Sequence, residues 1–171
     1  TTEFRTEEGW KKFRTRQSII NVADGSPKTL TLRWSDNGPI LPLDMFYLAS
    51  VTPRGHVPAL SFSALSPADK TMSAAFNMIQ AENVTDAIAA LEGYIAPSQN
   101  FTFIDRDSIG FKVIGAMPKR SINHQTQGRM PALGWVRDNQ WDGRLPYSDN
   151  PEVINPDTGI IGNTNNKTTN A

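Results

Sequence analysis

The 171-residue sequence contains no cysteine, only two histidines, and no apolar run long enough to span a membrane. Without cysteine the chain has no disulfide, no thiolate nucleophile and no cysteine-based zinc site. A transmembrane helix needs about 20 consecutive apolar residues, so we expect no membrane partner. Seventeen basic and seventeen acidic residues cancel, and neither sign forms a long run, so we expect no nucleic-acid partner.

The local motifs of several enzyme classes are also missing. His56 and His124 have no ligand-type residue three or four positions away, the spacing of a helical metal site. The "DRD" at Asp105 to Asp107 lacks the spacing of a calcium loop. There is no nucleophile elbow, dinucleotide fingerprint or phosphate-binding loop. We therefore expect no cofactor or metal held by this chain alone.

The first third of the chain has the pattern of a β-hairpin. Residues 12–21 alternate loosely and "TLTLRW" alternates cleanly, with an Asp24-Gly25 turn signal between them. The Gly38-Pro39 step that follows cannot continue a strand ladder. We predict that the apolar run after it, "LDMFYLASV", is extended.

Two helices are predicted next. Ser66 and Pro67 are typical of a helix start, which indicates a helix over about residues 67–80. Its apolar face would contain Met72, Ala75, Phe76 and Ile79. The second helix would be capped by Asn83 or Thr85 and closed by Pro97. Its apolar stripe would contain Ala87, Ile88, Leu91 and Tyr94.

Asn100 stands between the second helix and two further alternating runs, "NFTFID" and "SIGFKVIG", which predict a second hairpin. A polar amide at the start of a strand is either a turn device or a hydrogen-bond donor aimed at chemistry. Past Pro118 the sequence is rich in turn residues. Arg120 at this point could pair bidentately with a buried carboxylate, or it could be a solvated surface residue.

These patterns predict an α+β fold and a single domain piece over residues 1–171. Residues 1–65 would form the first hairpin and extended segments, residues 66–95 the helix pair, residues 96–120 the second hairpin, and residues 121–171 a loop-rich segment. The four tryptophans could line a ligand groove, but packing is the more common role of such residues. They are Trp10, Trp34, Trp135 and Trp141.

Several motifs in the second half occur in one order: "SQNFTFIDRDSIGF", "GAMPKR", "GRMPALGW" and "QWDGRLPYSDNPEVINPDTGIIGNTNNK". Together they resemble the penicillin acylase (penicillin amidase) family of N-terminal nucleophile hydrolases. The matching positions are Asn100, Asp105, Ile109, Gly110, Gly115, Pro118, Arg120, Trp141, Gly143, Pro146, Asn155, Pro156, Gly159, Asn165 and Asn166. The first half is similar more weakly, and it departs at Asp36-Asn37, where the family usually has a histidine before Gly-Pro.

The resemblance implies a parent enzyme with a four-layer αββα sandwich that removes an acyl group from a small amide. The acyl donor would be a β-lactam side chain, an acyl-homoserine lactone or a similar acylated amine. In the family, a newly exposed N-terminal serine attacks the amide carbonyl and its own α-amine is the base. The resemblance assigns Asn100 as an oxyanion-hole donor and Arg120 as an orienting residue near the site. Asp105 and the Asn165-Asn166 pair would be supports.

No serine nucleophile of this type is found in the chain, so the resemblance identifies it as an inactive internal fragment of the larger chain. Its partners would be the remaining acylase segments and the small acylated substrate. Calcium is an expectation for the parent enzyme, as is a periplasmic or secreted location. Two alternatives stay open: Thr1 as a threonine nucleophile if it were the true terminus, and a non-catalytic α+β binding or structural module.

Overall fold

The computed structural model describes residues 2–164 and residue 168. The chain divides into two compact units, each formed by two separated stretches of sequence. Unit 1 consists of Thr1–Phe62 and Arg120–Asp142, and unit 2 of Ser63–Lys119 and Gly143–Ala171. The fold is mixed α+β, with antiparallel sheets and one helix pair, as the sequence predicts. In the described part of the chain, no helix has the length and apolarity needed to cross a membrane.

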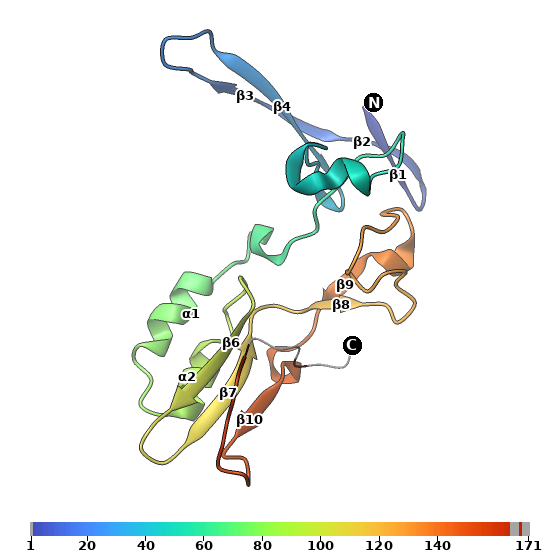
Figure 1. Ribbon diagram of the computed structural model, residues 1–171. Helices are drawn as coiled ribbons and strands as arrows, with labels where there is room; N and C mark the ends of the chain where they lie inside the picture. Colours follow the sequence, from blue (N-terminus) through green and yellow to red (C-terminus); the bar gives the residue numbers. More distant parts are fainter. Residues whose placement is uncertain (1, 165–167, 169–171) are drawn as a thin grey trace. The chain divides into compact units, whose positions relative to one another are not determined.

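Unit 1 is built mainly from β-hairpins (Figure 1). Its elements include β1 (Glu3–Thr6), β2 (Gly9–Lys12), β3 (Arg14–Ile20), β4 (Lys28–Ser35), β5 (Gly38–Pro39), η1 (Met45–Ser50) and η3 (Arg137–Asn139). β3 and β4 pair antiparallel, with Arg14 opposite Trp34 and Ile20 opposite Lys28. Asp24 has a positive φ of 55° in the turn between them. The first predicted hairpin is therefore confirmed.

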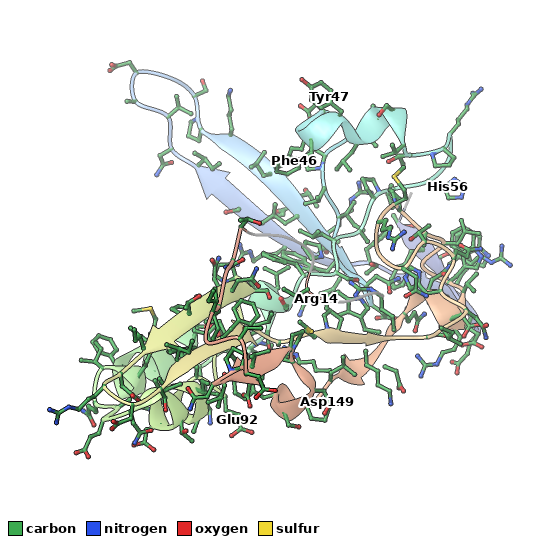
Figure 2. The ribbon with its side chains drawn as sticks, turned by 60° about the horizontal axis from the view of Figure 1, so that its bottom comes forward. Arg14, Phe46, Tyr47, His56, Glu92 and Asp149 are labelled. Carbon is green, nitrogen blue, oxygen red and sulfur yellow. The ribbon has the colours of Figure 1, made fainter. Side chains whose placement is uncertain are left out.

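The apolar run after β5 is not extended, so that prediction was wrong. It forms η1, a 3-10 segment in which Phe46 and Tyr47 have positive φ angles of 50° and 57°. Their side chains are 77% and 89% exposed, and Figure 2 shows both on η1. An apolar run that does not alternate specifies no sheet face. Pro39 and Pro42 also keep this part of the chain from continuing a ladder.

Unit 2 combines a three-stranded sheet in the order β10-β7-β6 with both helices (Figure 1). Its elements include η2 (Ser63–Leu65), α1 (Thr71–Met78), α2 (Val84–Ala90), β6 (Gln99–Ile104), β7 (Ile109–Ile114), η4 (Tyr147–Asp149) and β10 (Glu152–Ile154). In the antiparallel β6–β7 ladder Asn100 lies opposite Val113. The second predicted hairpin is confirmed, and β10 adds a strand where only loops were expected.

Helix α2 begins where the sequence indicates, because the Asn83 side chain accepts a hydrogen bond from the Asp86 backbone N–H at 2.9 Å. The helix packs closely on β7: a Cβ added to Gly110 would lie 2.5 Å from Val84 Cγ1. The absence of a side chain at position 110 therefore allows this contact. The core cluster of unit 2 contains Ala74, Val84, Ile88, Leu91, Phe103 and Ile114.

Helix α1 differs from its prediction in start and in orientation. It begins at Thr71 rather than Pro67, and just before its first turn Asp69 Oδ1 accepts from the Thr71 backbone N–H at 2.9 Å. The predicted apolar face is turned away from the core, which α1 contacts through Ala74 instead. The exposed members of that face are Met72, Phe76 and Ile79, at 68%, 63% and 74%.

The segment after β7 is less irregular than its composition indicates. β8 (Pro118–Arg120) and β9 (Trp141–Arg144) form a two-stranded ladder. The division of the chain into units falls within both strands. The turn-rich residues 121–171 therefore contain two short strands, β9 and β10, each too short to give a periodic signal.

Candidate functional site

Asn100 faces away from the helices of unit 2. Successive side chains of a strand point to opposite faces of a sheet, and Phe101 and Phe103 pack on the helix side with the core cluster. Asn100 therefore lies on the other face, together with its cross-strand neighbour Val113. We call this the Asn100 face, which consists of Asn100, Thr102, Phe111, Val113 and Val153.

The Asn100 face borders a shallow hollow of about 230 Å³. The residues after β10 form its far wall, and β7 and β10 form its floor. Its lining contains Phe111, Val153, Pro156, Ile160, Ile161, Gly162, Asn163 and Thr168. Most of these side chains are apolar, so the hollow suits a hydrocarbon group better than a charged one.

The Asn100 side chain is half-buried, and its Nδ2 donates a hydrogen bond to Asn163 Oδ1 at 3.2 Å. Among the described residues this is the one hydrogen-bond partner of the Asn100 side chain. A side-chain amide has two N–H donors, so one N–H of Asn100 is held and the other has no protein acceptor in the described part of the chain. The amide does not turn back to its own backbone, as a turn device would.

A buried polar cluster lies on the helix side of β7. Lys112 is 2% exposed, and its Nζ donates to the Asn150 backbone carbonyl and pairs with Glu152 Oε2, both at 3.1 Å. It also lies 4.6 Å from the centre of the Tyr147 ring. Burial raises the pKa of Tyr147 to about 12, with contributions from Glu152 and Glu92. A buried ammonium group requires such partners.

Asn150 and Tyr147 connect this cluster to the rest of unit 2. Asn150 Nδ2 donates to the backbone carbonyls of Val113 and Gly115, both at 2.9 Å. The Tyr147 hydroxyl donates to the Ile88 carbonyl at 3.0 Å near the end of α2. These bonds fix the position of β7, and with it the strand that carries Asn100.

Asp105 is a structural support at the far end of the β6–β7 hairpin. Its carboxylate accepts from the backbone N–H groups of Val84, Asp107 and Ser108 at 2.8, 2.8 and 2.7 Å. The bond from Val84, followed by those of the turn, holds the pKa of Asp105 below its ordinary 3.8. Asp105 therefore ties the start of α2 to the hairpin turn, as an N-terminal helix anion does.

Arg120 belongs to unit 1, whereas Asn100 belongs to unit 2. Its guanidinium lies 5.8 Å from the centre of the Trp141 ring, and a Cβ on Gly128 would lie 2.9 Å from Arg120 Nε. This Nε is buried without a hydrogen-bond partner. Within the described residues no carboxylate pairs with Arg120, so the bidentate pairing considered from the sequence is not observed there.

Three of the predicted residues lie outside the part of the chain that the structure describes: Thr1, Asn165 and Asn166. Among the described residues, no group of three or more His, Cys, Asp or Glu side chains is arranged to hold a metal ion.

Sequence reasoning missed Lys112, Asn150 and Asn163. A lysine within an alternating strand is normally assigned to solvent, and nothing local shows that residues 147–152 cover it. Asn163 lies in the quoted run "GNTNN", but its partner is 63 positions away, and a single sequence carries no signal for that pairing.

Comparison with known proteins finds relatives over the whole chain. The model of one family, described as penicillin amidase, matches residues 1–171. The chain belongs to the penicillin amidase family. The resemblance predicted from its motifs is therefore confirmed.

Relatives of this penicillin amidase family member are much longer than the chain. It is 30% identical over 162 residues to acyl-homoserine lactone acylase QuiP of Pseudomonas syringae pv. tomato, covering 93% of this chain and 18% of that protein. It is 28% identical over 159 residues to penicillin G acylase of Escherichia coli, covering 92% and 17%. The chain spans less than a fifth of these two relatives.

A solved structure shares the fold of this chain over nearly its whole length. The thermostable penicillin G acylase from Alcaligenes faecalis matches with a TM-score of 0.82 and 21% identity. The match covers 99% of this chain and 29% of that one. The α+β arrangement of antiparallel sheets and a helix pair is therefore the fold of one part of a penicillin G acylase.

Proposed function

We propose that this chain is part of an N-terminal nucleophile amidohydrolase in which Asn100 donates a hydrogen bond to the oxyanion of the reacting amide. The observation that carries the proposal is the placement of Asn100. Its amide lies on the sheet face opposite to the helices, beside an apolar hollow, with one N–H that no acceptor in the described residues occupies.

The proposed reaction needs this donor because attack on an amide carbonyl places negative charge on its oxygen. A preorganised N–H aimed at that oxygen stabilises the transition state more than the ground state. Removing one such donor typically lowers kcat by about 10² to 10³. The β6–β7 ladder and the hydrogen bond from Asn150 to the Val113 carbonyl of β7 hold Asn100 in place before substrate arrives.

The nucleophile would be a serine at the N-terminus of the parent's larger chain. A free α-amine has a pKa near about 8, so it accepts the hydroxyl proton at neutral pH, and one residue is both nucleophile and base. The 171 residues alone would then have no turnover. The whole enzyme would have the αββα sandwich, and Arg120 would orient groups near its site.

The substrate would be a small acylated amide, because the relatives are named as acylases of penicillin G and of acyl-homoserine lactones. The partners would be the other segments of the parent, since the chain spans less than a fifth of those relatives. A periplasmic or secreted location is part of the same proposal. A calcium ion in the parent enzyme is also part of this proposal, and no step is assigned to it.

The test uses the full-length enzyme and two substrates, a chromogenic phenylacetyl amide and an N-acyl-homoserine lactone. Asn100→Ala should lower kcat about 100-fold on whichever substrate is hydrolysed, with little change in KM. Thr102→Ala is the matched control, because Thr102 lies on the same strand and face and is exposed. It should change kcat by less than about 3-fold.

Two results would contradict the proposal. If Asn100→Ala retained wild-type kcat, Asn100 would not be the oxyanion donor. If the full-length protein hydrolysed the amide bond of neither the phenylacetyl amide nor the N-acyl-homoserine lactone, a non-catalytic binding or structural module would be the better interpretation.

A further inference from the structure

The single hydrogen bond of the Asn100 side chain links β6 to a distant segment. Asn163, its acceptor, lies in residues 155–163, which follow β10 and which we call the crossing segment. The bond joins Asn100 Nδ2 to Asn163 Oδ1 at 3.2 Å. Both ends come from unit 2, and Asn163 is exposed, so it does not fill the core.

The crossing segment starts at the opposite end of the sheet from Asn100. β10 pairs with β7 so that Ile154 lies opposite Gly110, whereas Asn100 lies opposite Val113. The segment is fixed at its start by Asn155, whose Oδ1 accepts from the Ile109 backbone N–H at 3.0 Å. Its Nδ2 donates to Ser108 Oγ at 3.2 Å.

The chain then reverses and passes along the Asn100 face. Asn155 has a positive φ of 47°, and Gly159, with φ of 67°, donates to the Pro156 carbonyl at 2.8 Å. From this turn the segment forms one wall of the hollow, with Ile160 and Ile161 beside Phe111. It ends at Asn163, beside Asn100. The crossing segment is therefore anchored by Asn155 at one end of the sheet and places Asn163 at the other end.

The hydrogen bond to Asn163 Oδ1 restricts the rotation of the Asn100 side-chain amide. A side-chain amide on a strand has several accessible χ1 and χ2 angles, and its two N–H groups point in different directions because the group is planar. When Asn163 Oδ1 holds one N–H, the direction of the other is set. Catalysis is sensitive to such direction, since a displacement of about 1 Å can cost about 10²-fold in rate.

We propose that Asn163 is a positioning residue that orients the Asn100 amide so that its free N–H points toward the oxyanion. This inference rests on the proposed function of Asn100. The crossing segment then has a role in the reaction, although Asn163 is 63 positions from Asn100 in the sequence.

The test compares four single variants, Asn100→Ala and three at Asn163, with two double variants of the full-length enzyme, assayed with the substrate that gives turnover. Asn163→Leu has a similar shape but no acceptor, and Asn163→Asp keeps the acceptor. We expect Asn163→Leu to lower kcat by about 10-fold to 100-fold with KM within about 2-fold, and Asn163→Asp to stay within about 3-fold of wild type. Asn163→Ala repeats the test if the leucine variant is poorly soluble.

The double variants Asn100→Ala/Asn163→Leu and Asn100→Ala/Asn163→Ala separate a positioning role from a purely structural one. If Asn163 acts through Asn100, neither double variant should be slower than Asn100→Ala alone. A further loss of about 10-fold would show that Asn163 acts independently and would overturn the inference, as would wild-type kcat in Asn163→Leu. If instead Asn100→Ala itself retained wild-type kcat, the proposed function would fail, which is a different outcome.

Discussion

The hairpins β3–β4 and β6–β7 have the same sequence signal and different surroundings. Each has alternating runs on both sides of a turn, and each forms an antiparallel ladder. In β7 five of the six residues are buried, whereas in β3 none is. The difference extends to the units: of the eleven buried hydrophobic residues among those described, Phe13 alone belongs to unit 1.

This comparison teaches that alternation identifies a strand but not what covers it. β5 pairs only with Trp34 and Ser35 at the end of β4, so the rest of the sheet is a two-stranded ribbon. Such a ribbon is marginal in water unless something packs on it, yet it exposes Ile19, Ile20 and Leu30 by 68%, 49% and 45%. Unit 2 covers its sheet with its own helices. Within the described residues, these three side chains of unit 1 have no such cover.

The largest expected effect compares the same substitution in the two hairpins. Ile114→Ala removes a side chain that is 0% exposed in β7 and should lower the free energy of unfolding by about 2 to 5 kcal/mol. Ile20→Ala, in β3 at 49% exposure, should change it by less than about 0.5 kcal/mol. Urea unfolding of the 171-residue chain measures both.

Two probes distinguish the units in that experiment. All four tryptophans lie in unit 1, and both helices lie in unit 2. Tryptophan fluorescence therefore reports on unit 1, and the α-helical signal of far-UV circular dichroism reports on unit 2. If Ile20→Ala destabilised the chain as much as Ile114→Ala, the hairpin β3–β4 would be covered and the comparison would be wrong.

A smaller effect is expected from two tyrosines. Tyr147→Phe leaves the Ile88 carbonyl without its donor and should lower the unfolding free energy by about 1 to 2 kcal/mol. Because the pKa of Tyr147 is raised to about 12, the folded state favours the neutral phenol. Its stabilising contribution is complete below the ordinary pKa of 10 and is lost as the pH rises toward 12.

Alkaline unfolding curves followed by circular dichroism test this point. Tyr147→Phe should remove the part of the stability loss that falls between pH 10 and 12. The control is Tyr47→Phe in unit 1, where the side chain is 89% exposed and little change is expected. An equal response of the two variants would show that Tyr147 is not specially placed.

The smallest expected effect concerns Asp105, which is half-buried and still partly reached by solvent, so its charge is screened. Its pKa in the folded state is below the ordinary 3.8, so its stabilising contribution is present above that value. The contribution is lost as the pH falls below 3.8 toward the folded-state pKa. Asp105→Asn should flatten the acid unfolding curve of unit 2, and Asp24→Asn, at the tip of β3–β4, is the control. An unchanged curve in Asp105→Asn would contradict this.

Local signals in the sequence predicted the elements whose causes are local. The Asn83 cap, the Asp24-Gly25 turn and the alternation of β6 and β7 each depend on residues within a few positions, and each was confirmed. The outward face of α1 and the 3-10 segment at Phe46 were not predicted. Both depend on whether a distant segment packs there.

The candidate site divides in the same way. The motifs around Asn100 indicated the family, and the family model matches the whole chain. The buried ion pair of Lys112 with Glu152 and the bond from Asn100 to Asn163 join residues 40 and 63 positions apart. No local pattern encodes such a pairing, because its energy arises only after the chain has folded.

By itself the sequence determined the strands of the two hairpins β3–β4 and β6–β7, the cap of α2 and the family, because each follows from short-range chemistry or from a motif. Only the tertiary structure decided which sheet face carries Asn100, what holds its amide, and which unit buries its hydrophobic residues. The physical reason is that burial and hydrogen-bond pairing are properties of neighbours in space, and in this chain those neighbours are far apart in sequence.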